Sequence, residues 1–280
     1  MRLTTPTNLR ASIEEAFADR TLLTSDVHRT AIGMAMHSLD EGALRVATPP
    51  QTPGGEWIVN AWLKQAILLF FAMQKMERIE VGPFEFYDKI PLKKHLEAAG
   101  VRLVPPGVIR YGAFLERGAI VMPGYVNIGA YVGAETLIDS HALVGSCAQI
   151  GSRVHLSACA QIGGVLEPVG ALPVIVEDDV LVGGNCGVYE GTILKRRVVL
   201  AAGSILTGST PLYDVPNDRI IEAVPGEPLV VPEGAVVVPG TRPVTSGRGR
   251  EWGLSIATPI IVKYRDERTS ARTALESWIR

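Results

Sequence analysis

The stretch VGAETLIDSHALVGSCAQIG, residues 132–151, places an aliphatic residue at every sixth position and decides the fold. The same period extends outward over sixteen positions: Val108, Phe114, Ile120, Val126, Val132, Ile138, Val144, Ile150, Leu156, Ile162, Val176, Val182, Val188, Leu194, Leu200 and Leu206. A six-residue period fits neither an α-helix nor a free strand. It fits a short strand and a turn, repeated three times per triangular coil. The period therefore predicts a mainly β protein built on a left-handed parallel β-helix.

Two interruptions divide the repeat. The period breaks after Ile162 and resumes at Val176 shifted by two residues, so residues 163–175 are predicted to be an inserted loop. Residues 207–222, which contain TPLYDVPNDR, are predicted to form a second loop or extended excursion. Loops that leave a rigid scaffold often carry binding chemistry.

The segments on either side of the repeat differ from it in pattern. We predict a mostly helical domain over residues 1–103, the β-helix over 104–240 and a small cap over 241–280. Expected elements of the flanks are helices at 9–19, 25–39 and 61–76, a hairpin pairing 44–48 with 57–59, a mobile loop at 241–250, a strand at 254–264 and a terminal helix at 266–280.

Composition limits the class of protein. The 280 residues are 47% hydrophobic and 20% charged, as in globular proteins with a large core. The net charge of −2 gives no support for a nucleic-acid partner. Three cysteines without a CxxC spacing indicate reduced thiols and no zinc site. The first ten residues lack the apolar run of a signal peptide, and no stretch is apolar enough to span a membrane, so we expect a cytoplasmic protein.

Several segments closely resemble one family of hexapeptide-repeat enzymes. They are GALRVA (42–47), AWLKQAILLFF (61–71), FYDKIPLK (86–93), VRLVPPGVIRYGAF (101–114), MPGYVNIGAYV (122–132), VGSCAQIG (144–151), VHLS (154–157) and IGGVLEP (162–168). They resemble the tetrahydrodipicolinate N-succinyltransferase family of the lysine and diaminopimelate pathway. The resemblance implies a homotrimer with active sites between subunits, small-molecule substrates, and transfer of a succinyl group from succinyl-CoA to an amine without a metal.

The resemblance also implies catalytic residues. Asp139 in TLIDS matches an acidic residue of the family and is the first candidate for the general base, although aspartate is also common at a coil corner. Arg110 matches a family arginine suited to a substrate carboxylate, with a surface salt bridge as the alternative. Within the shared motifs, Ser146 and Glu167 are further candidates for substrate binding, and Gly164 for contact with the CoA thioester.

One segment departs from the family. Where the family reads roughly GARSEVVEG, this chain has GGNCGVYEG at 183–191, so the arginine is Asn185 and the first glutamate is Gly187. Only the second glutamate, Glu190, is retained as a catalytic candidate. Asp139 could act alone, or His141 could serve as a base near neutral pH, although a lone histidine at a coil face is more often packed or hydrated. The same departure leaves open an acetyl-CoA donor in a specialised pathway, or a catalytically silent binding module.

The thioester requires a slot for its pantetheine arm and cations for its phosphates. The small residues Gly184, Ala202 and Gly203 would allow the arm to approach the coils, although tight corners also select small residues. Lys263 is a candidate phosphate ligand, together with Lys195, Arg196 and Arg265; a solvated basic surface is the alternative for each.

Overall fold

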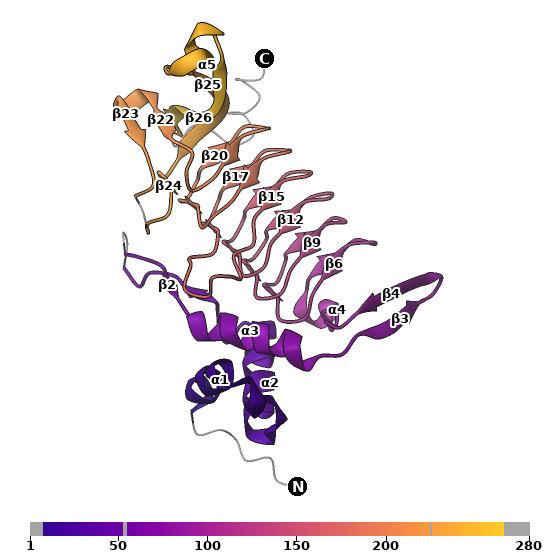
Figure 1. Ribbon diagram of the computed structural model, residues 1–280. Helices are drawn as coiled ribbons and strands as arrows, with labels where there is room; N and C mark the ends of the chain where they lie inside the picture. The colour runs from indigo at the N-terminus through magenta and orange to yellow at the C-terminus, as the bar shows by residue number, and fades with distance from the viewer. Residues whose placement is uncertain (1–7, 53–54, 225, 266–280) are drawn as a thin grey trace.

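The structure is a computed structural model that describes residues 8–52, 55–224 and 226–265. It is an elongated three-sided prism with a helical domain along one side and a β-rich cap at the C-terminal end (Figure 1). Among the described residues, no helix has the length and apolarity required to cross a membrane.

The prism is a left-handed parallel β-helix made of three sheets. The first contains β6 (Val108–Ile109), β9 (Tyr125–Val126), β12 (Leu143–Val144), β15 (Gln161–Ile162), β18 (Gly187–Val188) and β21 (Ile205–Leu206). The second contains β7 (Phe114–Leu115), β10 (Tyr131–Val132), β13 (Gln149–Ile150), β16 (Ile175–Val176), β19 (Ile193–Leu194) and β24 (Val230–Val231). The third contains β5 (Arg102–Leu103), β8 (Ile120–Val121), β11 (Leu137–Ile138), β14 (His155–Leu156), β17 (Leu181–Val182), β20 (Val199–Leu200) and the start of β25 (Ala235–Pro243). The predicted fold class is confirmed, and the first coil begins at β5, slightly before residue 104.

The second residue of each short strand points into the prism. These side chains are buried from Val126 to Leu206 at the predicted positions. In the first coil, however, the buried residues are Ile109, Leu115 and Val121, and the predicted Val108, Phe114 and Ile120 are only half-buried. The turn at 122–124 is one residue short, which moves the inward position from 121 to 126. The prediction of an unbroken period was therefore wrong by one residue before this turn.

Three edges run along the prism where turns connect the sheets. The aspartate edge comprises turns 122–124, 139–142, 157–160, 183–186 and 201–204, between the third and first sheets. The loop edge comprises turns 110–113, 127–130, 145–148, 163–174 and 189–192, between the first and second sheets. The ion-pair edge comprises turns 116–119, 133–136, 151–154, 177–180 and 195–198, between the second and third sheets.

The N-terminal domain packs against the loop edge. Its helices are α1 (Leu9–Ala18), α2 (Asp26–Asp40) and α3 (Ala61–Met73), with a 3-10 turn η1 (Arg20–Thr24) and the predicted short hairpin of β1 (Ala47–Thr48) and β2 (Ile58–Val59). One apolar cluster joins these helices to Ile128 and Cys147 of the β-helix. Gly129 permits this contact, since a Cβ there would lie 2.8 Å from Ile67 Cδ1. Lys64, fully buried, donates to Ala171 O at 2.6 Å and so fastens α3 to the inserted loop.

A second hairpin and a short helix complete the N-terminal part. The hairpin of β3 (Glu77–Val81) and β4 (Phe84–Asp88) projects from the body (Figure 1) and precedes α4 (Leu96–Ala99). The predicted helix to residue 76 ends at Met73 because the chain then enters this hairpin. Phe84, Phe86 and Tyr87 are exposed on it.

The cap continues the third sheet. Strand β26 (Ser255–Tyr264) pairs antiparallel with β25, and the hairpin of β22 (Leu212–Asp214) and β23 (Arg219–Ile221) extends it through the 3-10 turn η2 (Val215–Asn217). The segment 241–250 is not the predicted loop throughout, because β25 extends to Pro243 to pair with β26 and a short helix α5 (Gly247–Glu251) follows. The predicted terminal helix at 266–280 lies outside the described residues.

Candidate functional site

Asp139 lies on the aspartate edge, directly after β11. Its Oδ1 accepts a hydrogen bond from Ser140 N at 2.6 Å, and its Oδ2 lies 3.7 Å from Nε2 of His155. The two meet because β11 pairs with β14, which places His155 opposite Leu137, one coil further along the prism. The Asp139 and His155 side chains are 32% and 43% exposed, so solvent and ligands can reach them. The structure thus supplies a carboxylate with an adjacent imidazole.

His155 is a functional candidate that the sequence patterns did not identify. Its Nε2 is buried and has no hydrogen-bond partner among the described residues. An unsatisfied buried polar atom costs free energy unless it has a role or a ligand. The signal was present in the sequence, because one coil spans 18 residues here and aligns residue 155 with 137.

His141 occupies the third position of the same turn. Its φ is +59°, in the left-handed region, where histidine is found more readily than most residues. Its side chain is exposed. Other turns place Glu135, Cys147 and Asn185 in the same conformation, so the turn does not require a histidine and the catalytic role of His141 stays a prediction.

The aspartate edge also carries three of the predicted thioester contacts. Gly184 lies in the turn 183–186, and Ala202 and Gly203 lie in the next turn, 201–204. These turns are two and three coils beyond Asp139, or about 10 and 14 Å along the prism axis at normal strand spacing. Ala202 and Gly203 are exposed, and nothing lies within 4 Å of a Cβ placed at Gly203. Beyond Asp139, the aspartate edge thus carries small residues that are exposed to solvent.

The other predicted residues of the coils gather on the loop edge. Gly164, Glu167 and Glu190 line a hollow of about 730 Å³ between the inserted loop and the turn 189–192. Ser146 lies one coil before it and accepts through its backbone oxygen from Val165 N at 3.1 Å. Glu190 is exposed and its Oε2 accepts from Gly208 N at 2.9 Å. The structure does not bring these residues into contact with Asp139 within one chain.

The departure at Gly187 has a structural counterpart in Tyr189. A Cβ at Gly187 would lie 2.4 Å from Cε2 and 2.9 Å from the hydroxyl oxygen of Tyr189. The tyrosine ring therefore occupies the space that a side chain at position 187 would need. The phenol hydroxyl stands close to where a longer polar side chain at 187 would begin.

Two predicted residues lie apart from the others. Arg110 donates from Nη2 to Asp88 Oδ2 at 2.6 Å, so the ion pair that was the alternative to substrate binding is present. This pair connects the first coil to the end of β4. Lys263 lies on β26 in the cap, half-buried and opposite Val236.

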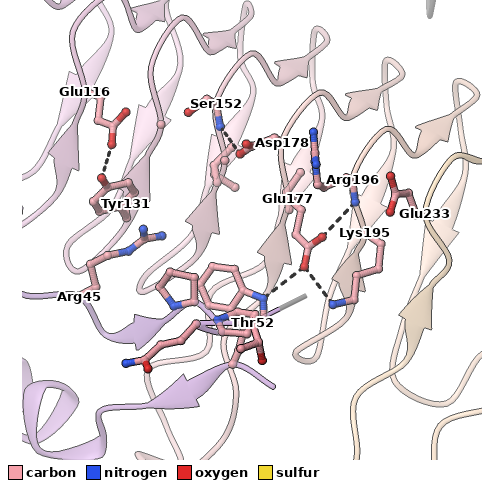
Figure 2. Close-up of a pocket in the computed structure, with 18 residues that line it drawn as sticks. Arg45, Thr52, Glu116, Tyr131, Ser152, Glu177, Asp178, Lys195, Arg196 and Glu233 are labelled. Atoms are coloured by element: carbon pink, nitrogen blue, oxygen red, sulfur yellow. Dashed lines mark hydrogen bonds and ion pairs between the residues drawn. The ribbon is translucent and has the colours of Figure 1, made fainter. Parts of the chain in front are cut away.

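A further cavity of about 690 Å³ lies on the second sheet and the ion-pair edge, facing the β1–β2 hairpin (Figure 2). Its charged lining residues are Arg45, Glu116, Glu177, Asp178, Lys195, Arg196 and Glu233. Of the residues predicted from the sequence, only the candidate phosphate ligands Lys195 and Arg196 line it. The cavity depends on contacts between residues about a hundred positions apart, such as Arg45 with Gln149, and has no local sequence signal.

Among the residues that the structure describes, no group of three or more His, Cys, Asp or Glu side chains is arranged to hold a metal ion. The three cysteines are free. Burial raises the pKa of Cys147 to about 12 and of Cys186 to about 11, which disfavours the thiolate form of either as a nucleophile.

Comparison with known proteins connects this geometry to a family. Residues 8–73 match the model of the tetrahydrodipicolinate N-succinyltransferase N-terminal domain, and residues 173–208 match the hexapeptide repeat of succinyl-transferase. The 2,3,4,5-tetrahydropyridine-2,6-dicarboxylate N-succinyltransferase of Idiomarina loihiensis is 41% identical over 98% of each chain. The protein of the same name from Acinetobacter baylyi is 41% identical over 97% of this chain and 98% of its own.

The chain belongs to this N-succinyltransferase family. The family's N-terminal match covers α1 to α3, and its hexapeptide match covers β16 to β21, which includes the departing segment 183–191. The likeness runs nearly end to end, so the helical domain and the cap belong to the same family unit as the prism.

A solved structure was also matched. It is a putative 2,3,4,5-tetrahydropyridine-2-carboxylate N-succinyltransferase from Campylobacter jejuni, 17% identical, with a TM-score of 0.44. The match covers 82% of this chain and 62% of that one. At this score the similarity adds nothing to the assignment of the fold, which rests on the strand pairing.

Proposed function

We propose that this chain is a CoA-dependent N-acyltransferase that moves a succinyl group from succinyl-CoA to the amine of 2-amino-6-oxopimelate, the ring-opened form of tetrahydrodipicolinate. The observation that carries the proposal is the near end-to-end 41% identity to relatives named for succinyl transfer to this acceptor. The open position of Asp139 beside His155 supports it.

The reaction asks little of the protein beyond placement and one proton transfer. The amine nitrogen attacks the thioester carbonyl carbon, an N–C bond forms, the C–S bond breaks and CoA leaves as the thiol. The amine proton must pass to a base and then to the departing sulfur, and we assign that role to Asp139. Such a positioned base contributes about 10²- to 10⁴-fold, and placing the two reactants together supplies much of the remaining rate.

We assign His155 to positioning Asp139. Its Nε2 lies 3.7 Å from Asp139 Oδ2, within reach of a hydrogen bond after a small side-chain shift. The Ser140 backbone N–H already holds the other carboxylate oxygen. A carboxylate held at both oxygens keeps one orientation toward the incoming amine.

The donor is proposed to lie along the aspartate edge. Gly184, Ala202 and Gly203 leave room for the pantetheine arm, and Lys263 in the cap is the proposed phosphate ligand. No part of this slot requires a metal or a bound cofactor beyond the CoA thioester itself.

We propose that the active site is completed by a second copy of the chain in a homotrimer. Within one chain, the predicted residues divide between the aspartate edge and the loop edge, and a neighbouring prism could bring Ser146, Glu167 and Glu190 opposite Asp139. The exposed aromatic side chains of the β3–β4 hairpin support a contact between copies. In the arrangement we propose, Arg110 would need to exchange Asp88 for the substrate carboxylate.

A mixing experiment tests this division. Asp139→Asn and Glu190→Gln should each reduce turnover. The two variants are then co-expressed with different affinity tags, and the mixed trimers are purified through both tags. If the two edges come from different copies of a cyclic trimer, activity should return at about a third of the interfaces. Activity that never exceeds the sum of the two variants would contradict a site shared between copies.

The acetyl donor is a second candidate, favoured by Asn185 and Gly187, which stand where the family has an arginine and a glutamate and so remove two charged groups. A free-thiol assay with succinyl-CoA and acetyl-CoA, using the same acceptor, separates the two. We expect a higher kcat/KM with succinyl-CoA. Faster turnover with acetyl-CoA would favour the second candidate. If neither donor releases thiol, the remaining interpretation is that the chain is a catalytically silent binding module.

We also propose a cytoplasmic location, which the free state of all three cysteines supports. Tagged protein in a fractionated cell of the source organism should appear with cytoplasmic markers.

A further inference from the structure

Lys64 is a buried basic residue to which the proposed acyl transfer gives no role. It lies on α3, its side chain is fully buried, and its Nζ donates to Ala171 O of the inserted loop at 2.6 Å. Lysine is almost never fully buried unless it is paired with an opposite charge. Among the residues that the structure describes, however, this carbonyl oxygen is the one hydrogen-bond partner of Nζ.

Lys64 has no counter-ion in the described part of the chain. Burial lowers the pKa of Lys64, and the Cys147 thiol acts in the opposite direction. Burial raises the pKa of Cys147 itself to about 12, so this thiol is not an anion near neutral pH. An apolar residue of similar size in place of a buried charge is often neutral or stabilising. The packing of α3 therefore does not require a lysine, whereas the contact with the loop does require a donor.

The contact lies in the part of the inserted loop that has the fewest other hydrogen bonds. The start of the loop is fixed where Val165 N donates to Ser146 O at 3.1 Å, and its end is fixed where the chain enters β16. Between these points, residues 167–172 make one hydrogen bond with the rest of the described chain, and Lys64 donates it. Lys64 is therefore the polar anchor of this segment.

A tight turn connects the anchored residue to Glu167. Ala171 N donates to Pro168 O at 3.0 Å, so the residue that Lys64 holds is hydrogen-bonded to the neighbour of Glu167. Glu167 is exposed and lines the hollow of about 730 Å³ on the loop edge. A shift of Ala171 would therefore move Glu167 as well.

The loop lies directly against the opposite wall of this hollow. A Cβ at Gly191 would lie 2.8 Å from Leu172 O, so the glycine leaves room for the loop to approach the turn 189–192. Glu190 lies in the same turn and also lines the hollow. The width of the hollow is thus set by how closely the loop is held to this turn.

We propose that Lys64 is a positioning residue for the acyl transfer, which holds residues 167–172 against the turn 189–192 and so keeps Glu167 at the wall of the acceptor site. The inference rests on the proposed function. Lys64 does not touch the substrate, because its own side chain is fully buried, and it acts through Ala171. When the loop is released, only a fraction of the molecules has Glu167 in place, and the apparent affinity for the acceptor falls by that fraction.

Hydrogen exchange of the substrate-free chain tests the contact itself. In the wild type, the Ala171 amide should be protected, because it is hydrogen-bonded within a turn that Lys64 holds. Lys64→Met keeps a long side chain but removes the donor, and should speed the exchange of residues 166–172 about threefold to tenfold. The flanking strands β15 and β16 should exchange as in the wild type.

Steady-state kinetics tests the consequence for the substrate. Lys64→Met should raise KM for 2-amino-6-oxopimelate about threefold to tenfold, and should change KM for succinyl-CoA by less than about twofold, since the donor is proposed to lie on the aspartate edge. The matched control is Lys75→Met, at an exposed lysine just beyond the end of α3, which should change neither value.

A double-mutant cycle separates positioning from a general loss of stability. If Lys64 acts through Glu167, Lys64→Met should raise the acceptor KM much less in a chain that already carries Glu167→Gln. A purely structural role would give the same increase in both backgrounds, and that result would overturn the proposal.

The wild-type turnover separates this inference from the proposed function. Absence of thiol release by the wild type would count against the proposed function, whereas an active Lys64→Met with an unchanged acceptor KM would overturn this inference alone. Unchanged exchange of residues 166–172 in Lys64→Met would also overturn it. If Lys64→Met does not fold, the wild type decides: protection of the Ala171 amide supports the anchor, and exchange as fast as in an unstructured chain contradicts it.

Discussion

The aspartate edge and the ion-pair edge are built from the same four-residue turn but carry different chemistry. On the ion-pair edge, Arg153 pairs with Asp179 in the next coil through contacts of 2.7 and 2.9 Å, and Arg196 lies 3.7 Å from the same carboxylate. On the aspartate edge, Asp139 has no cation of this kind and faces only the His155 imidazole. The first edge is neutralised by pairing along the prism, whereas the second leaves a carboxylate available to a substrate.

The contrast teaches that the repeat fixes the backbone and leaves the outer turn positions free to vary. The inward residue of each strand is buried against the coils above and below, and its burial contributes about 1.5–3 kcal/mol. The outer turn residues are less buried between coils, so packing does not decide which residue type occupies them. Their identity is instead set by function or by ion pairing. Functional side chains on this scaffold are therefore expected at the turns.

The largest expected effect comes from removing the Asp139 carboxylate. Asp139→Asn keeps the shape of the turn and should reduce kcat by about 10²- to 10⁴-fold, since a positioned base is lost. The measurement is steady-state thiol release with succinyl-CoA.

The matched control is His141→Asn in the same turn, where asparagine accepts the left-handed φ. It should leave kcat almost unchanged. If His141→Asn causes the larger loss, the base has been assigned to the wrong residue.

Neighbouring residues of β21 test the inside of the prism against its outside. Leu206→Ala should lower the free energy of unfolding by about 2–5 kcal/mol because it opens a cavity between coils. Ile205→Ala, at a side chain that is 47% exposed, should cost less than about 1.5 kcal/mol. Denaturant titrations of the two variants provide the comparison. Equal losses would show that the inward and outward positions are not distinguished by packing.

The Gly187 departure can be reversed in two steps. Gly187→Glu alone should destabilise the chain by about 1–3 kcal/mol through overpacking, because its side chain meets the Tyr189 ring. Gly187→Glu with Tyr189→Val restores the family pattern at both positions and should recover most of that loss. Thermal denaturation measures the stability of both variants. No recovery in the double variant would mean that another contact excludes a side chain at 187.

The smallest effect is expected on the ion-pair edge. Arg153→Met should cost only about 0.2–1 kcal/mol, because the Arg153 side chain is 49% exposed and its pair is screened by solvent. The hydrogen bond from Arg153 lowers the pKa of Asp179. This stabilisation is present above the unfolded pKa of about 3.9 and disappears as pH falls through the lower, folded value.

The difference in stability between wild type and Arg153→Met should therefore be seen at pH 7 and vanish in strong acid, in parallel urea titrations. Turnover should not change. A loss of activity as large as that of Asp139→Asn would remove the distinction between the two edges.

Much of the fold could be predicted because the six-residue period is itself the packing rule of the prism. Burial of Val126 to Leu206 at the expected positions follows from that rule. The short turn at 122–124 was missed because Val108, Phe114 and Ile120 are also apolar and mimic the correct residues one position later. Two adjacent apolar residues cannot be told apart by period alone.

The β3–β4 hairpin was missed for a different reason. Most of its side chains are exposed, so no buried face imposes an alternating pattern that decides its register. The strand at the start of 241–250 was missed because it forms only through pairing with β26, which is a non-local contact.

Only part of the candidate site could be predicted from the sequence. The family resemblance gave Asp139 its candidate role, but the adjacent His155 required the 18-residue coil to be counted from strand to strand. Tyr189 required the position of its ring against Gly187. The cavity beside Arg45 is assembled from the N-terminal domain and successive coils from Glu116 to Glu233, and no single segment contains enough of it to be recognised.

A structure of the chain with succinyl-CoA and an unreactive acceptor analogue tests the central claim most directly. The account predicts that the pantetheine arm follows Ala202 and Gly203 on the aspartate edge, with the acceptor amine within hydrogen-bond distance of Asp139. A thioester carbonyl found in the cavity beside Arg45, away from Asp139, would contradict it.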